Sequence, residues 1–257
     1  MKKIIIAILT LVLVNGMTGA AFAEESYNQT LQTEKEVTLA VKQLSADGKL
    51  SEKDKAIILE NASQAAIDAY VKEKVTESFD LAGALNGEVN MDGTSCKTEV
   101  FQLENGCTLT MKFTEGADLG KLSTKRAANG ETLWKDYGNR YFTATATVDV
   151  GLGAGTIALE NHYILSEKGV DENYGQTKVS SPSGAAVITA EKVQITDRAA
   201  RNAGSSDVNM YADFKIISKT GTTGIIEKSK RLSTSVGYVD HNKTTKQIKV
   251  KHSWSLS

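Results

Sequence analysis

The stretch RYFTATATVDVGLGAGTIALENHYIL, from Arg140 to Leu165, decides the fold class of this chain. Apolar and polar residues alternate along both halves, and a glycine-rich segment from Gly151 to Ala154 separates them. A period of two is typical of a strand that buries one face, so the two halves predict an antiparallel hairpin. With that segment as a four-residue loop, Val148 would lie opposite Ile157. One dry face and one wet face favour a β-sandwich or an open barrel.

The alternating pattern extends over most of the chain. Thr, Val, Ile and Tyr alternate with polar residues, and turn signals rich in Gly and Asn recur between the runs. We therefore predict that residues 81–257 form one antiparallel β domain. A second hairpin, around Glu104-Asn105-Gly106, would place Phe101 on the same face as Leu109. In the last predicted strand His252 falls on the apolar face, where we expect a hydrogen-bonded core histidine.

Residues 24–80 predict a small helical hairpin that packs on the β domain. Thr33 and Glu36 have the spacing of a capping box, and Ser51 and Asp54 repeat that spacing at the start of a second, longer helix. Apolar residues follow each cap at helical spacing. Two short helices bury little surface by themselves, so we expect their apolar seam to lie on another element.

The first 23 residues have the pattern of a secretory signal peptide. Two lysines precede an apolar run from Ile4 to Val14, and Ala21 and Ala23 supply the small residues that signal peptidase needs. The apolar run is shorter than the ~20 residues of a membrane-spanning helix. We expect cleavage before Glu24 and a secreted, extracellular mature protein, and the style of the signal is bacterial.

Composition and motifs argue against several classes of function. Without the leader, 28 basic and 31 acidic residues would remain, and this balance does not favour nucleic-acid binding. The sequence has no HExxH, CxxC, P-loop, dinucleotide or GxSxG motif. We therefore predict no metal site and no cofactor, while the many acidic residues leave a paired-carboxylate site open.

The only two cysteines, Cys96 and Cys107, would lie in a compartment where disulfides form. The hairpin around Asn105 argues against a bond, because it separates the two cysteines by roughly 23 Å of extended strand. The strand could end or bend near Thr98, and on that condition we predict a disulfide between Cys96 and Cys107.

The densest aromatic segment runs from Leu133 to Phe142. Within it Trp134, Tyr137, Arg140 and Tyr141 combine rings with a cation beside a turn. Exposed rings stack on sugars and anchor protein partners, so we predict these four residues as a ligand-binding set. The alternative is that the rings pack across strands in the core.

A basic run marks the last two predicted strands. It comprises Lys228, Lys230, Arg231, Lys243, Lys246, Lys249 and Lys251. Such a run could bind an anionic cell-surface polymer through a field that salt screens. The alternative is a solvated strand face whose lysines protect a sheet edge.

Two further segments contain candidate metal ligands. The segment from Gln43 to Asp54 resembles an EF-hand loop, but Gln43 stands where calcium needs a carboxylate and Asp54 is shorter than the usual Glu. Glu160 and His162 share one strand face and could form an acid–base pair or an exposed metal site. We predict a capped helix–turn–helix in the first segment and a solvated polar face in the second.

Taken together, these patterns favour a secreted binding or surface-interaction protein without enzymatic activity. Its expected partner is an anionic cell-surface polymer, a glycan or another protein. Two alternatives stay open. The Arg140–Leu165 hairpin resembles the insertion hairpins of β-pore-forming toxins, which implies a membrane-active protein. The chain could also be a secreted hydrolase whose acid–base site has no recognisable motif.

Overall fold

The computed structural model describes residues 30–45, 49–91, 96–117, 134–181, 187–220 and 224–257. The predicted leader, residues 1–23, lies outside these ranges. Within them the helices are α2 (Glu34–Leu44), α3 (Glu52–Asn61) and α4 (Gln64–Leu81). The strands are β1 (Leu85–Val89), β2 (Cys96–Gln102), β3 (Thr108–Ala117), β4 (Trp134–Asp136), β5 (Gly138–Asp149), β6 (Ala154–Ser166), β7 (Gly169–Ser180), β8 (Val187–Ala190), β9 (Gln194–Asp197), β10 (Ala199–Ala200), β11 (Val208–Thr220), β12 (Gly224–Asn242) and β13 (Gln247–Leu256).

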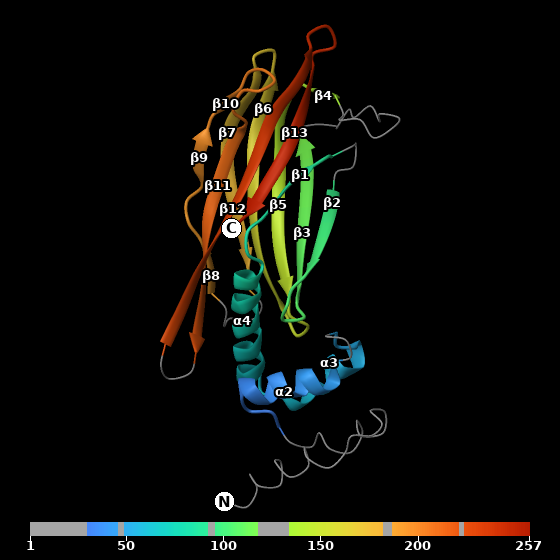
Figure 1. Cartoon of the computed structure of the whole chain (residues 1–257), viewed down its shortest axis with the longest axis vertical. Coiled ribbons are helices and arrows are strands. Elements are labelled where there is room, and N and C mark those ends of the chain that lie inside the picture. Colours follow the sequence, from blue (N-terminus) through green and yellow to red (C-terminus); the bar gives the residue numbers. More distant parts are fainter. Residues whose placement is uncertain (1–29, 46–48, 92–95, 118–133, 182–186, 221–223) are drawn as a thin grey trace, which may run out of the picture.

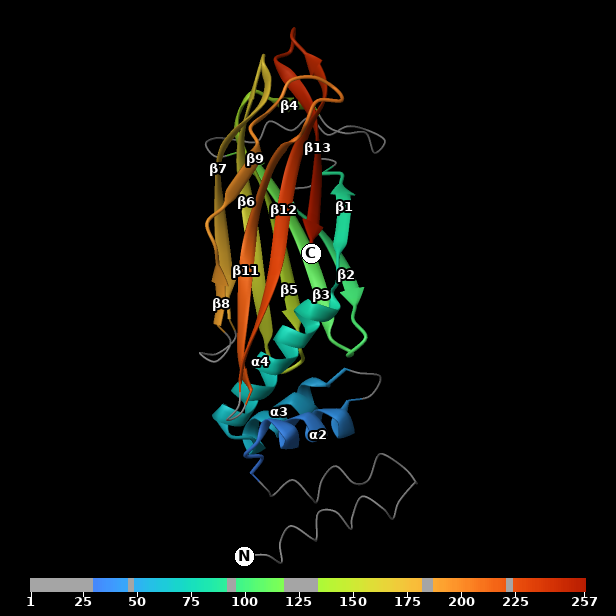
Figure 2. The same ribbon diagram turned by 60° about the vertical axis from the view of Figure 1, so that its left-hand side comes forward.

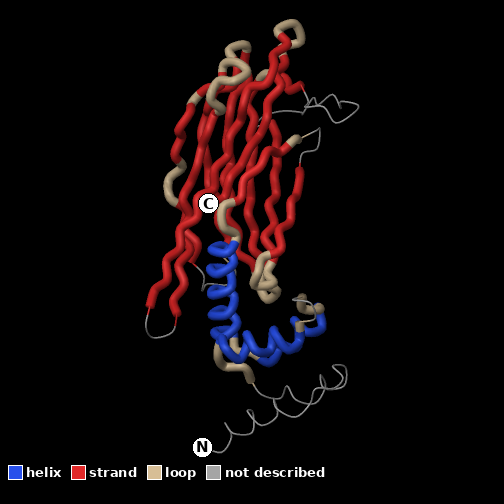
Figure 3. The backbone as a smooth tube through the Cα atoms, viewed as in Figure 1, coloured by secondary structure: helices blue, strands red, loops and turns tan. Residues whose placement is uncertain are grey.

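The strands form two antiparallel sheets that pack face to face. The seven-stranded sheet has the order β1-β13-β12-β11-β8, with β4 paired to β13 and β9 paired to β11. The six-stranded sheet has the order β10-β7-β6-β5-β3-β2. Figures 1 and 2 show the strands running along the long axis of the molecule, and Figure 3 shows the helices gathered at one end. The predicted mainly β chain with N-terminal helices is confirmed, and its architecture is a β-sandwich.

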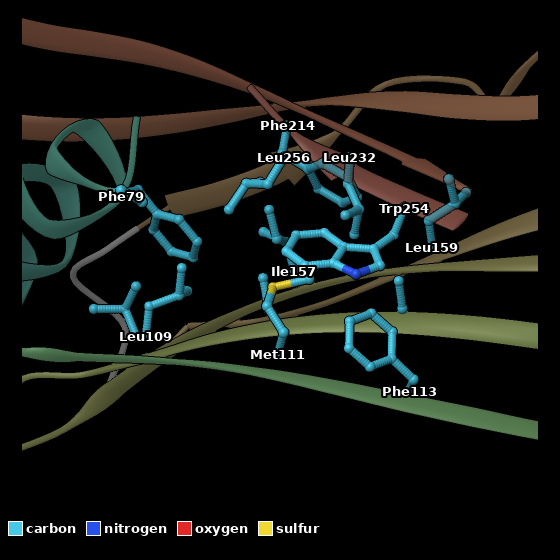
Figure 4. Close-up of a cluster of buried hydrophobic side chains, with 14 of the residues drawn as sticks. Phe79, Leu109, Met111, Phe113, Ile157, Leu159, Phe214, Leu232, Trp254 and Leu256 are labelled. Atoms are coloured by element: carbon cyan, nitrogen blue, oxygen red, sulfur yellow. The ribbon is translucent and has the colours of Figure 1, made fainter. Parts of the chain in front are cut away.

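The core lies between the two sheets (Figure 4). Phe113 and Ile157 of the six-stranded sheet and Phe214 and Leu232 of the seven-stranded sheet have no exposed surface. Burying a side chain of this size contributes about 1.5–3 kcal/mol, whereas an exposed ion pair contributes ~0–1 kcal/mol. The alternation that predicted the strands is therefore also what stabilises the sandwich.

The β5–β6 hairpin forms as predicted, with a register that differs by two residues. Val148 pairs with Gly155, and Ala146 pairs with Ile157. The loop is Val150 to Gly153 rather than Gly151 to Ala154, and the Val150 N–H donates to the Gly153 carbonyl at 2.9 Å. A shift of two residues leaves every side chain on its predicted face, because strands alternate with a period of two.

The helical segment contains one more helix than the predicted hairpin. The caps at Thr33 and Ser51 are confirmed, and the Thr33–Glu36 pair forms a full capping box. The predicted second helix is interrupted at Ala62, which is extended, and Ser63 caps α4. The break is held by Leu31, whose backbone bonds to Asn61 and Ser63 on either side of Ala62. Two helices, α3 and α4, therefore replace one long helix.

Helix α4 closes one end of the sandwich. Val75 and Phe79 are fully buried and belong to the same hydrophobic cluster as both sheets. The Tyr70 hydroxyl donates to the Val150 carbonyl at 3.3 Å, which ties α4 to the β5–β6 loop. At Gly155 a Cβ would lie 2.6 Å from Cγ1 of Val75, so β6 needs glycine where the helix approaches. No helix among the described residues is long and apolar enough to span a membrane.

The predicted disulfide between Cys96 and Cys107 is wrong, because both cysteines are free. The register of the β2–β3 hairpin keeps the two cysteines too far apart to form a bond. Phe101 pairs with Leu109 as predicted, and the strand continues without a bend to the pair of Cys96 with Thr114. Cys96 therefore lies at the far end of β2, exposed, while Cys107 is buried beside the loop.

Candidate functional site

The four residues predicted as one ligand-binding set lie in three different places. Trp134 and Tyr137 lie at the β4 end of the seven-stranded sheet, where β4 pairs with β13. Arg140 points inward and is 4% exposed. Tyr141, the next residue on β5, therefore points outward from the six-stranded sheet. The structure does not bring the set together.

The rings of Trp134 and Tyr137 are engaged within the chain. The Nζ atom of Lys249 lies 5.3 Å from the centroid of the Trp134 ring, a cation–π contact. The Tyr137 hydroxyl contacts Nε2 of His241, and the ring of Tyr238 meets the His241 ring edge-on. We refer to Tyr137, Tyr238 and His241 as the tip cluster. Trp134 is not part of it, because Trp134 lies with Lys249 on the outer face of the sheet.

The predicted basic run does not form one positive surface. Lys228 pairs with Asp80 at 2.9 Å, and Arg231 pairs with Asp213 at 2.8 Å. Lys251 lies 3.5 Å from Asp207. The remaining four predicted cations are dispersed. Lys230 is buried and bonds to the Gly83 carbonyl, and Lys249 covers Trp134. Lys243 and Lys246 lie in the β12–β13 turn, Lys246 with φ of 56°. Strands β12 and β13 both have neighbours on each side in their sheet, so the lysines on them do not protect an edge.

Arg140 belongs to an ionic network inside the sandwich. Glu115 pairs with Lys135 and accepts from the Tyr163 hydroxyl at 2.8 Å, and that hydroxyl lies 3.2 Å from Nε2 of His252. Lys135 and His252 come from the seven-stranded sheet and the other members from the six-stranded sheet, so the network joins the two sheets. Arg140 donates to the Asp136 carbonyl, and one of its terminal nitrogens is buried without a partner in the structure.

Burial controls the protonation of this network. Desolvation lowers the pKa of His252 to about 4, although Glu115 opposes the shift. Desolvation also favours the neutral acid at Glu115, but attraction to His252 and Lys135 outweighs it, and the pKa of Glu115 falls below its usual value. His252 is the hydrogen-bonded core histidine that the strand pattern predicts. The network joins the two sheets, and Lys135 and His252 also line a cavity of about 340 Å³ beside β1 and β13.

Three rings from neighbouring strands contact one another on the outer face of the six-stranded sheet. Tyr141 of β5, His162 of β6 and Tyr174 of β7 are neighbours in the strand register. The ring centroids of Tyr141 and His162 are 5.9 Å apart. Those of His162 and Tyr174 are 3.9 Å apart, with ring planes at 14°. We refer to these three residues as the aromatic row.

Local backbone features place both ends of the aromatic row. Gly116 of β3 pairs with Tyr141, and a Cβ at Gly116 would lie 2.4 Å from the Tyr141 ring, so the ring lies against the backbone of β3. On the other side the register of β6 and β7 shifts after the pair of His162 with Tyr174, which makes Asn173 an extra residue on β7. Such a bulge re-aims side chains. Tyr174 is 42% exposed and His162 only 4%.

Glu160 places an anionic acceptor beside the aromatic row. Its carboxylate lies 2.6 Å from Nε2 of His162, and it accepts from Thr143 at 3.1 Å and from Lys178 at 3.3 Å. Partial burial raises the pKa of Glu160, but the hydrogen bonds from His162 and Lys178 outweigh burial and leave the pKa below its usual value. The carboxylate is therefore held ionised and fixed in position.

A regular field of threonine hydroxyls continues from the aromatic row along the same face. Thr147 of β5 pairs with Thr110 of β3 and Thr156 of β6, and the hydroxyls of Thr147 and Thr156 are 3.0 Å apart. Thr114 pairs with Thr143, which lies two same-face positions nearer the rings than Thr147 does. This face therefore combines rings, a carboxylate and hydroxyls on one side of a sheet.

Sequence reasoning identified Tyr141 but did not connect it to its neighbours. The prediction that Glu160 and His162 share a strand face is confirmed, and the two side chains are in contact. The predicted solvated face is wrong for His162, because Tyr174 stacks on its ring. Tyr174 was missed, since its place depends on the pairing of β6 with β7 and on a bulge. The one sequence feature that could have indicated Tyr174 is that it is an aromatic residue in a strand of alternating polar and apolar residues.

The segment from Gln43 to Asp54, predicted as a capped helix–turn–helix without calcium ligation, includes residues 46–48, which lie outside the described ranges. Asp54, at the last position of the loop, accepts a 2.5 Å hydrogen bond from the Ser51 hydroxyl at the start of α3. In the part of the chain that the structure describes, no three His, Cys, Asp or Glu side chains gather as a metal ion would require.

Comparisons with protein-family models, with curated proteins and with solved structures yield no match for this chain. The candidate site is therefore defined by its geometry: the aromatic row, Glu160 and the threonine field on the outer face of the six-stranded sheet.

Proposed function

We propose that this chain is a secreted, non-enzymatic protein that binds a glycan on the outer face of its six-stranded sheet. The observation that carries the proposal is the aromatic row, with Tyr141 held against Gly116 and Tyr174 exposed at the other end. The secretory leader predicted at residues 1–23 supports an extracellular ligand.

Sugars match this face for two chemical reasons. The C–H groups of a pyranose ring form an apolar face that packs on aromatic rings, whose own faces carry partial negative charge. The sugar hydroxyls need donors and acceptors at fixed positions, and Glu160, Gln176 and Lys178 surround the rings. A carboxylate that is already fixed by three side chains loses little freedom when it binds a hydroxyl.

The size of the site favours a chain of sugars over a single sugar. The two centroid distances, 5.9 and 3.9 Å, set the separation of Tyr141 and Tyr174 at no more than about 10 Å, which adjacent sugars of one chain can span. The threonine field extends the face beyond the rings. Affinity should therefore rise with the length of the oligosaccharide.

Retention on insoluble peptidoglycan, chitin and cellulose tests the proposal. The Tyr141→Ala and Tyr174→Ala variants should each weaken retention about fivefold or more, since a stacked ring contributes about 1 kcal/mol. Tyr211→Ala is the matched control, because this ring lies against Arg231 on the outer face of the other sheet. Equal retention of all three variants would refute the site. Loss of retention in Trp134→Ala alone would move the site to Trp134, where β4 pairs with β13.

A further inference from the structure

A cavity that differs chemically from the glycan-binding face lies where the helices meet the sandwich. It has a volume of about 420 Å³, and its walls come from α2, α3 and α4 and from the loops of the β2–β3 and β5–β6 hairpins. The site is far from the aromatic row, since Tyr141 and Val150 are separated by roughly 30 Å along β5. We call it the junction cavity.

The charged groups in the walls of the junction cavity are mostly positive. Among the described residues that line it, four are lysines, Lys42, Lys49, Lys55 and Lys74, and one, Asp149, has a carboxylate. The Asp149 carboxylate already accepts from the Gly151 N–H at 2.8 Å in the β5–β6 loop. Cations gathered around a concave, low-dielectric wall raise the local concentration of anions.

The four lysines differ in how far they are neutralised. Lys55 pairs with Glu52 at 2.8 Å, and Lys74 pairs with Glu77 at 2.6 Å. Lys42 and Lys49 form no ion pair with another described residue. The Glu52 side chain is 90% exposed, so its attraction to Lys55 is weakened by water. The cavity therefore keeps a net positive charge that an anionic ligand can neutralise.

The uncharged residues that line the junction cavity indicate what the non-phosphate part of the ligand is like. Leu50 and the ring of Tyr70 are apolar, whereas Thr38 and Asn105 offer hydrogen-bonding groups. A volume of about 420 Å³ lies within the ~300–1,000 Å³ of small-molecule sites. A phosphate monoester carries a charge of about −1.5 to −2 at pH 7, which suits several lysines better than one carboxylate does.

We propose that the junction cavity binds a small organic phosphate, a phosphorylated polyol or sugar, whose phosphate lies among the lysines. This site is independent of the glycan-binding face, so either one can fail without the other. The ligand would bridge the helices and the hairpin loops, and would therefore also fasten the helical end to the sandwich.

Calorimetric titration of the mature protein at low salt with glycerol 3-phosphate, inorganic phosphate and glycerol tests this site. Glycerol 3-phosphate should bind, and inorganic phosphate and glycerol should bind at least several-fold more weakly. The Lys42→Gln/Lys74→Gln variant should weaken glycerol 3-phosphate binding about tenfold or more, because each charged hydrogen bond contributes about 1.5 kcal/mol or more.

The control variant is Lys35→Gln/Lys53→Gln, which removes two exposed charges from α2 and α3 outside the cavity. This variant should bind like the wild type. Equal weakening in the two double variants would show a general charge effect and overturn the proposal. Absence of glycerol 3-phosphate binding, or equally tight binding of inorganic phosphate, would overturn it as well. Circular dichroism of both variants confirms that the fold is intact.

Discussion

The buried histidine makes the stability of this protein depend on pH. His252 has a folded-state pKa of about 4 against an ordinary value of 6.5. The unfolded chain therefore binds the proton more tightly than the folded chain does. The stabilisation is complete above about pH 6.5 and is lost as the pH falls toward 4. At about 1.4 kcal/mol per pH unit, the difference is worth about 3 kcal/mol.

Urea denaturation at several pH values between 7 and 4 measures this effect. The His252→Gln variant will be less stable than the wild type at pH 7, because it loses the contact of the imidazole with Phe142. Between pH 7 and pH 4, however, the free energy of unfolding of this variant should fall by about 3 kcal/mol less than that of the wild type. His241→Gln is the control, because His241 lies in the partly exposed tip cluster.

Two results would refute the reasoning on His252. If wild type and His252→Gln lose the same free energy of unfolding between pH 7 and pH 4, the imidazole does not titrate as its burial requires. If His241→Gln reproduces the flattened pH dependence, the effect comes from a different histidine. Glu115, whose pKa lies below its usual value, destabilises the fold in the same direction on acidification, so the difference between variants is the quantity to compare.

Three further predictions concern the fold. Gly155→Ala should lower the free energy of unfolding, measured by urea denaturation, by about 1–3 kcal/mol, and adding Val75→Ala should recover part of that loss. Additive losses in the double variant would contradict the close packing of α4 on β6. A thiol reagent should modify exposed Cys96 quickly and buried Cys107 only on unfolding, because burial raises the pKa of the Cys107 thiol. If mass spectrometry of the native protein shows that neither cysteine is modified, the finding of free cysteines is contradicted. Val148→Asp should unfold the domain, and the wild type should release no dye from liposomes, because Val148 lies in the core; dose-dependent release would support the membrane-active alternative.

The strands and helix caps could be predicted from the sequence because both depend on local chemistry. Alternation fixes which face of β5 is buried, and it does so even though the predicted register of its hairpin was two residues off. Thr33 and Ser51 are caps because their side chains bond within the first helical turn. The break at Ala62 could not be predicted, since it depends on Leu31 pairing from outside the helices.

The candidate site was only partly predictable. Alternation places Arg140 on the same face as the core residue Phe142, so its inclusion among ligand-binding residues conflicted with the pattern itself. The same alternation places Tyr141, the next residue after Arg140, on the outer face of the sheet. It does not place Tyr174, because a bulge and a strand pairing that the sequence does not specify bring that ring onto His162.

The ring signals of the histidines give the most direct test of the glycan-binding face. The chain has three histidines, and they lie in the aromatic row, the tip cluster and the core. In an NMR titration with soluble oligosaccharides of peptidoglycan or chitin, the His162 ring signals should shift to saturation, while those of His241 and His252 stay in place. A shift of His241 with an unchanged His162, or no shift of any histidine, would contradict the account.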